Sequence, residues 1–155
     1  MRRFVVLIAS VVALIVASAA PAGALDSGLV TYFSATYNGQ IQCAQGRNDI
    51  GTQTNYNVGG GAYSYAAKDL YCSNYFYLPQ NWIGVHPVVQ RYYNSNWYTA
   101  IDSGLAQNYA TNHWVVSAAY ANWISGYWWR MVTQHIVIVA GDYRQTLIVT
   151  GNVST

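Results

Sequence analysis

Tight turns between runs of alternating polar and apolar residues constrain the fold of this chain most. Residues 31–43 turn at Asn38-Gly39, a pair that readily supplies both positive φ angles of a two-residue type I′ turn. With that turn, Ser34 lies opposite Cys43 in an antiparallel pair. The pattern predicts a β-hairpin here and favours an antiparallel architecture.

Two more hairpins are predicted. Residues 134–140 and 143–150 flank Gly141-Asp142, and residues 88–93 and 97–101 flank the segment 94–96. In the first of these, one face would carry Ile136, Ile138, Leu147 and Val149. The other face would carry Val137, Val139 and Ile148, together with His135 and Arg144. Because strands that are apolar on both faces usually lie between layers, we expect this pair to be central in the fold.

The remaining segments give weaker signals. Residues 71–78 alternate and predict a strand, whereas Gly59–Gly61 and residues 102–104 predict breaks. Residues 62–70 could form a helical turn or two, and residues 113–124 fit either a strand or a short capped helix. The sequence therefore predicts an all-β fold, an antiparallel β-sandwich or small barrel of hairpins with at most one or two short helical turns.

Residues 1–24 have the pattern of a secretory signal. Arg2-Arg3 precedes the apolar run 4–17, and small residues close the segment before Leu25. Cleavage is expected after Ala24. The alternative is a retained membrane anchor, because residues 4–20 reach the lower length limit of a spanning helix. The sequence predicts a secreted protein with one small extracellular β domain, residues 25–155.

Cys43 and Cys72 are the only cysteines of the chain. In an oxidising compartment an isolated pair most simply forms one disulfide. Closing a loop of this length would stabilise the fold by roughly 3–4 kcal/mol.

The formal net charge of +2 comes from Arg2 and Arg3, two of the seven basic residues. Beyond residue 24 the charges balance: Arg47, Lys68, Arg91, Arg130 and Arg144 against Asp26, Asp49, Asp69, Asp102 and Asp142. Nucleic-acid binding needs clustered basic residues that displace counterions. The composition therefore excludes a nucleic-acid partner.

Catalytic and metal-binding patterns are not found in the sequence. The five aspartates are scattered and several adjoin turn residues, the ordinary use of Asp. His86, His113 and His135 lack a local ligand spacing, so only the fold could bring them together on a metal. We expect His86 in a loop before Pro87, and His135 hydrogen-bonded between layers. No catalytic residue, metal site or cofactor is predicted.

Aromatic side chains are the most distinctive feature, with 15 Tyr and 6 Trp in the whole chain. Trp114 and Trp123 lie among apolar residues and are expected in the core; Trp97 fits either the core or the surface. Trp128 and Trp129 are consecutive, so in a strand they face opposite sides. The candidates for ligand contact are Tyr71, Tyr75, Tyr77, Tyr92, Tyr93, Trp97, Tyr98, Tyr127, Trp128 and Trp129.

These features favour a secreted, non-enzymatic binding module whose aromatic and amide side chains contact a glycan or another cell-envelope component. One alternative is a membrane-active or antimicrobial protein, because Tyr and Trp suit the membrane interface. The others are a small secreted hydrolase and a surface protein that self-assembles through strand edges. The sequence leaves the ligand and the oligomeric state open.

Overall fold

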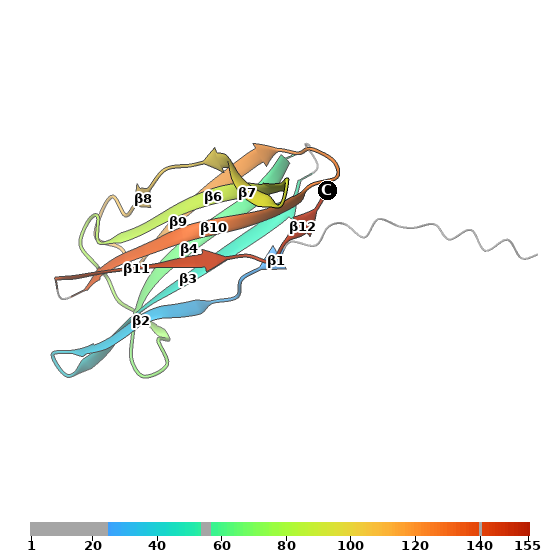
Figure 1. The fold of residues 1–155 in the computed structure, drawn as a ribbon. Coiled ribbons are helices and arrows are strands. Elements are labelled where there is room, and N and C mark those ends of the chain that lie inside the picture. The colour runs from blue at the N-terminus through green and yellow to red at the C-terminus, as the bar shows by residue number, and fades with distance from the viewer. Residues whose placement is uncertain (1–24, 54–56, 140) are drawn as a thin grey trace, which may run out of the picture.

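The computed structural model describes residues 25–53, 57–139 and 141–155 (Figure 1). Residues 1–24, with the predicted signal segment, lie outside the described residues. The fold is all-β, with two antiparallel six-stranded sheets. Its strands are β1 Leu25–Asp26, β2 Val30–Tyr37, β3 Gln40–Thr52, β4 Asn57–Lys68, β5 Asn74–Tyr75, β6 Ile83–Tyr93, β7 Asn96–Asp102, β8 Ala106–Gln107, β9 Trp114–Asn122, β10 Trp128–Val139, β11 Asp142–Val149 and β12 Val153–Ser154.

Each sheet has two long central strands. In the first sheet β3 pairs with β4; β1 and β2 pair along the free side of β3, and β5 and β9 along the free side of β4. In the second sheet β10 pairs with β6; β11 and β12 lie beside β10, and β7 and β8 beside β6. The two sheets pack on each other as a sandwich (Figure 1). Each sheet therefore has one inner face and one outer face.

The core lies between the two inner faces. It combines small residues of the first sheet with larger residues of the second. The first sheet contributes Ala44, Ile50, Val58, Ala62, Ala66, Val115, Ala119 and Ala121, and the second Ile83, Val85, Val89, Trp129, Met131, Val137, Val139 and Val153. Successive side chains of a strand point to opposite faces of the sheet, so the apolar residues at alternate positions point together into the space between the two sheets.

The predicted hairpins form, with small changes at two turns. Asn38 and Gly39 have positive φ, and Ser34 lies opposite Cys43 as expected. Tyr93 pairs with Asn96, so the second turn is Asn94-Ser95, one residue shorter than predicted. The turn predicted at Gly141-Asp142 was also misplaced, because Asp142 lies in β11 opposite Val139.

The β10–β11 hairpin carries the predicted faces but is not central. The pairing places Ile136, Ile138, Leu147 and Val149 on one face and His135, Val137, Val139, Arg144 and Ile148 on the other. β10 is a central strand, whereas β11 is at the sheet edge, where Leu147 is exposed. The apolar pattern of β11 therefore does not indicate a strand between two layers.

Gly59–Gly61 were predicted to break the chain, yet they lie inside β4, which continues through residues 62–68 instead of forming helical turns. A Cβ on Gly59 would lie 2.0 Å from the carbonyl oxygen of Ala119, and one on Gly60 would lie 2.2 Å from that of Asp49. Gly59 and Gly60 are thus required by the close approach of neighbouring backbone. Residues 113–124 are resolved as strand β9 over Trp114–Asn122.

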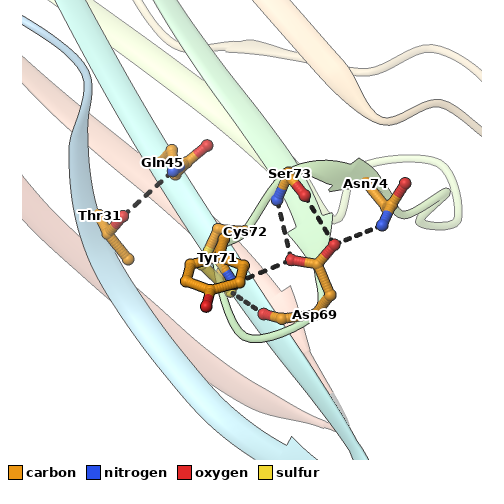
Figure 2. Close-up of a disulfide and its surroundings, with 8 residues drawn as sticks. Thr31, Gln45, Asp69, Tyr71, Cys72, Ser73 and Asn74 are labelled. Atoms are coloured by element: carbon orange, nitrogen blue, oxygen red, sulfur yellow. Dashed lines mark hydrogen bonds between the residues drawn. A yellow bond between two sulfur atoms is a disulfide. The ribbon is translucent and has the colours of Figure 1, made fainter.

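The segment 71–78 was predicted as a strand, but it forms the two-residue strand β5 at Asn74–Tyr75 and an isolated bridge between Leu78 and Asn112. The preceding residues form a turn around Asp69, whose carboxylate accepts hydrogen bonds from the amides of Tyr71 and Ser73 and from the side chains of Ser73 and Asn74 (Figure 2). These donors lower the pKa of Asp69 to about 2. Cys72 in this turn forms the predicted disulfide with Cys43.

Within the described part of the chain, no helix is long and apolar enough to cross a membrane.

Candidate binding surface

Three aromatic side chains form a row across the outer face of the second sheet. Tyr92 on β6 pairs with Trp97 on β7 and with Trp128 on β10. Paired residues of antiparallel strands point to the same side of a sheet, and strands lie about 4.8 Å apart, so the row spans three adjacent strands. We call these three residues the aromatic row. All three were candidates from the sequence, where they are up to 36 positions apart.

The aromatic row lines a shallow hollow of about 330 Å³ together with Asn152. Trp128 is 51% exposed and Tyr92 38%. The rings of Tyr92 and Trp97 are 5.1 Å apart and tilted by 54°. They form a concave surface with apolar walls and an amide at its margin, rather than a flat platform.

Arg130 supports the row from the side. Its guanidinium lies 4.2 Å from the ring centre of Trp97, and its Nε donates a hydrogen bond of 2.9 Å to Oε1 of Gln90. The cation–π contact and the hydrogen bond hold the guanidinium against the indole. The hollow is therefore bounded by groups that are held in place before any ligand arrives.

A second group of candidate rings lies on the opposite side of β6 and β7. Tyr93 contacts Tyr98 and Tyr127, with ring centres 6.4 and 5.9 Å apart. Arg91 lies 4.8 Å over Tyr127. These residues share the inward side of the strands with Trp129, so they do not extend the aromatic row.

The loop after β4 carries the third candidate group. Tyr75 stacks on His113 at 4.1 Å, and Tyr77 meets the same ring edge-on at 5.0 Å. Tyr71 is 82% exposed and lies beside the disulfide (Figure 2). Tyr75 lies in β5 of the first sheet, whereas Tyr71 and Tyr77 lie in the turn and loop on either side of it, so the three do not extend the row.

Several tryptophans occupy other environments than the sequence suggested. Trp129 was a contact candidate but is only 1% exposed, and its Nε1 donates to Oγ1 of Thr155 at 3.1 Å. Trp128 faces the opposite side, as the strand alternation predicts. Trp114 and Trp123, expected in the core, are 38% and 36% exposed. Trp114 is paired with Tyr65 and so points to the outer face of the first sheet, whereas Trp123 follows the end of β9.

Sequence reasoning missed a pair of tyrosines on the outer side of β4. Tyr63 and Tyr65 have nearly parallel rings, 6.4 Å apart with planes 10° from each other. Their strand was not recognised because the glycine run was interpreted as a break and residues 62–70 as a helical turn or two. A signal was present, since Tyr63 and Tyr65 alternate with buried Ala62, Ser64 and Ala66.

The three histidines lie in separate parts of the fold, and His86 contacts an aspartate. His135 is buried and hydrogen-bonded through Nε2 to Oδ1 of Asn48 at 2.8 Å, as expected between layers. His86 lies in β6 rather than in a loop, and its Nε2 is 2.5 Å from Oδ1 of Asp102; this contact lowers the pKa of Asp102. His113 lies among the loop tyrosines. Within residues 25–53, 57–139 and 141–155, no group of three His, Cys, Asp or Glu side chains is placed to hold a metal.

No family model, curated protein or solved structure matches this chain. The functional argument therefore depends on the geometry.

Proposed function

We propose that this protein is a secreted binding module that holds a neutral polysaccharide chain of the cell envelope or surroundings in the hollow of the aromatic row. The observation that carries the proposal is the meeting of Trp97, Tyr92 and Trp128 from three strands around one hollow with an amide at its edge. Aromatic rings bind the apolar faces of sugars, and amides bind their hydroxyls. The leader-like residues 1–24 and the disulfide support export.

The charges of the chain favour a neutral ligand. Beyond residue 24 five basic residues balance five acidic ones, and Arg130 at the hollow is engaged by Trp97 and Gln90. Binding to anionic membranes usually requires clustered basic residues. A neutral glycan suits this surface better than a lipid bilayer or an acidic polymer.

The test is affinity electrophoresis in gels that contain soluble xylan, mixed-linkage β-glucan, hydroxyethyl cellulose or dextran, with sedimentation on peptidoglycan sacculi and chitin. Retardation or co-sedimentation with at least one probe is expected. Trp128→Ala should weaken it roughly tenfold, because truncating a central aromatic contact removes more than 1 kcal/mol.

Tyr143→Ala is the matched control. Tyr143 is exposed on the same outer face but pairs with Ile138, ten residues along β10 from Trp128, about 33 Å away. It should bind as the unmodified protein does. Equal losses in both variants, or no binding to any probe, would overturn the proposal. Dye release from phosphatidylcholine–phosphatidylglycerol vesicles without polysaccharide binding would support the membrane-active alternative instead.

A further inference from the structure

The outer face of the first sheet contains a second ring-lined surface, on β4. The ring of Tyr63 lies along the strand over Gly61, because a Cβ on that glycine would be 2.8 Å from the tyrosine hydroxyl oxygen and 3.0 Å from Cε2. The Tyr65 ring follows at 6.4 Å and is nearly parallel. Glycine on the same face two positions earlier therefore makes room for a strip of two rings along one strand.

A hollow adjoins each end of this strip. One, of about 350 Å³, is lined by Gly59–Gly61, Tyr63 and Tyr120; the other, of about 380 Å³, by Tyr65, Gln45, Arg47 and Tyr75 among others. Gly59 and Ala67 are eight residue steps apart along an extended strand, about 27 Å. We call the two hollows with Tyr63 and Tyr65 the β4 track. Its length suits an extended chain of several units rather than one small molecule.

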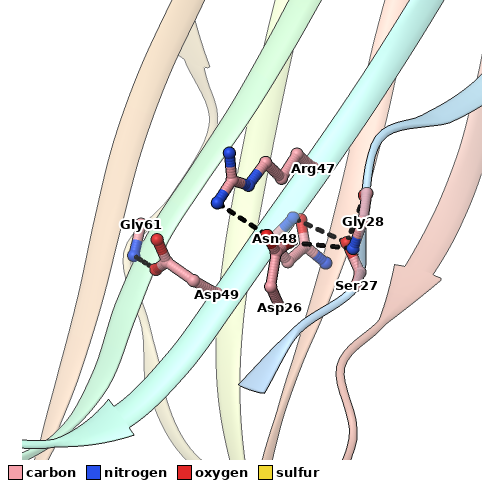
Figure 3. Close-up of polar contacts among 7 residues, drawn as sticks. All are labelled: Asp26, Ser27, Gly28, Arg47, Asn48, Asp49 and Gly61. Carbon is pink, nitrogen blue, oxygen red and sulfur yellow. Dashed lines mark hydrogen bonds and ion pairs between the residues drawn. The ribbon is translucent and has the colours of Figure 1, made fainter. Parts of the chain in front are cut away.

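The charged groups of the β4 track are paired within the protein. Arg47 contacts Asp26 at 2.6 Å, and the carboxylate of Asp49 accepts a hydrogen bond from the amide of Gly61 (Figure 3). Gln45 donates to Thr31 at 3.2 Å (Figure 2). A surface of rings, amides, hydroxyls, one ion pair and one hydrogen-bonded carboxylate complements an uncharged, hydroxyl-rich polymer.

One end of the track is closed by the disulfide-linked turn. Cys72, Ser73 and Tyr75 line the larger hollow. The disulfide to Cys43 fixes the turn to β3, and the hydrogen bonds to Asp69 hold its backbone (Figure 2). This wall is therefore preformed, which reduces the entropy lost when a ligand binds.

From this geometry we infer that the β4 track binds a second neutral glycan chain, so that one molecule links two chains through opposite faces of the sandwich. The two sheets pack through their inner sides, which leaves the aromatic row and the β4 track facing away from each other. The inference takes its ligand class from the proposed function but uses a different set of residues.

The experiment measures light scattering of the same soluble polysaccharides as protein is added, beside retardation in the gels. The unmodified protein should raise the scattering by cross-linking chains. Tyr63→Ala with Tyr65→Ala should abolish that rise but leave retardation through the aromatic row. Tyr75→Ala removes an exposed ring from the wall of the track and should weaken cross-linking severalfold. Because this single change is at the surface, it tests the track even if the double variant does not fold. Tyr143→Ala is again the control.

The combined variants separate the two sites. Trp128→Ala should keep residual retardation, and adding Tyr63→Ala and Tyr65→Ala should remove it. Complete loss with Trp128→Ala alone would overturn the track and leave the proposed function standing. Unchanged retardation with Trp128→Ala, lost in the triple variant, would overturn the row and leave the track as the binding site. Cross-linking that survives loss of the track would show that it arises from association of copies.

Discussion

The two outer faces of the sandwich present aromatic rings in different ways. On the second sheet the aromatic row runs across three strands, so each ring comes from a different part of the chain and the row depends on the register of β6, β7 and β10. On the first sheet the rings run along β4, where glycine spacing and the disulfide-linked turn shape the surface. Changes to the core or the turn should therefore affect the two faces unequally.

The largest expected effect is on the free energy of unfolding, and it should differ between variants of the neighbours Trp128 and Trp129. Trp129 lies in the core behind the row, and Trp129→Ala should lower the free energy of unfolding by about 3–5 kcal/mol through cavity formation. Trp128→Ala removes an exposed ring and should change it by roughly 0.5 kcal/mol or less. Urea unfolding followed by circular dichroism measures both. Similar costs for the two would contradict their assignment to opposite faces.

Removing the disulfide should weaken binding at the β4 track more than binding at the aromatic row. The bond joins residues 29 apart, and replacing Cys43 and Cys72 by Ala should lower the free energy of unfolding by about 3–4 kcal/mol. The turn that closes the track also loses its anchor to β3. We expect the variant, while folded, to lose cross-linking but retain retardation that depends on Trp128. An equal loss of binding at the track and at the row would show that the disulfide-linked turn also supports the row.

The two sheets share a polar contact in the interior, and its buried histidine should make the fold sensitive to acid. His135 on β10 donates from Nε2 to Asn48 on β3, and its Nδ1 has no hydrogen-bond partner among the described residues. Burial lowers the pKa of His135 to about 4. The unfolded chain, with a pKa near 6.5, then binds a proton first, so stability falls as the pH decreases from about 6.5 to about 4, by roughly 3 kcal/mol in total.

His135→Gln tests this contact, because its amide can still donate to Asn48 but does not titrate. Urea midpoints at several pH values should fall less steeply between pH 6.5 and 4 in the variant than in the unmodified protein. Parallel curves would assign the acid sensitivity to other groups.

A fixed neighbour makes Gly59 the next most sensitive position. Its added Cβ would meet the Ala119 carbonyl in β9, which cannot move without disturbing the pairing of β4 and β9. Overpacking of this kind costs about 1–3 kcal/mol. Gly59→Ala should lower the urea midpoint and distort the nearer end of the track while the row still binds. An unchanged urea midpoint would show that the backbone of β9 can shift to make room for the added Cβ.

Local patterns predicted the hairpins and the row residues, because turn chemistry and alternation are encoded within a few positions. Asn38-Gly39 and the alternation of Trp128 and Trp129 are examples. The prediction at the glycine run failed for a non-local reason: β4 pairs with β3 and with β9, and the backbone of Asp49 and of Ala119 in these strands leaves no room for a side chain at Gly60 and Gly59. Residues 71–78 alternate like a strand, but Asp69 and the disulfide take their backbone into a turn.

A small effect on stability is expected at Gly61, where the neighbouring atoms belong to a side chain and not to the backbone. A Cβ there would approach the far end of the Tyr63 side chain, which can rotate away, and not a fixed backbone atom. Gly61→Ala should therefore cost less than about 1 kcal/mol, well below Gly59→Ala. Yet the displaced Tyr63 ring would no longer lie parallel to the Tyr65 ring. Cross-linking of soluble glycan should therefore fall severalfold, while retardation through Trp128 stays the same. If cross-linking is unchanged, the parallel arrangement of the two rings is not what binds a chain on this face.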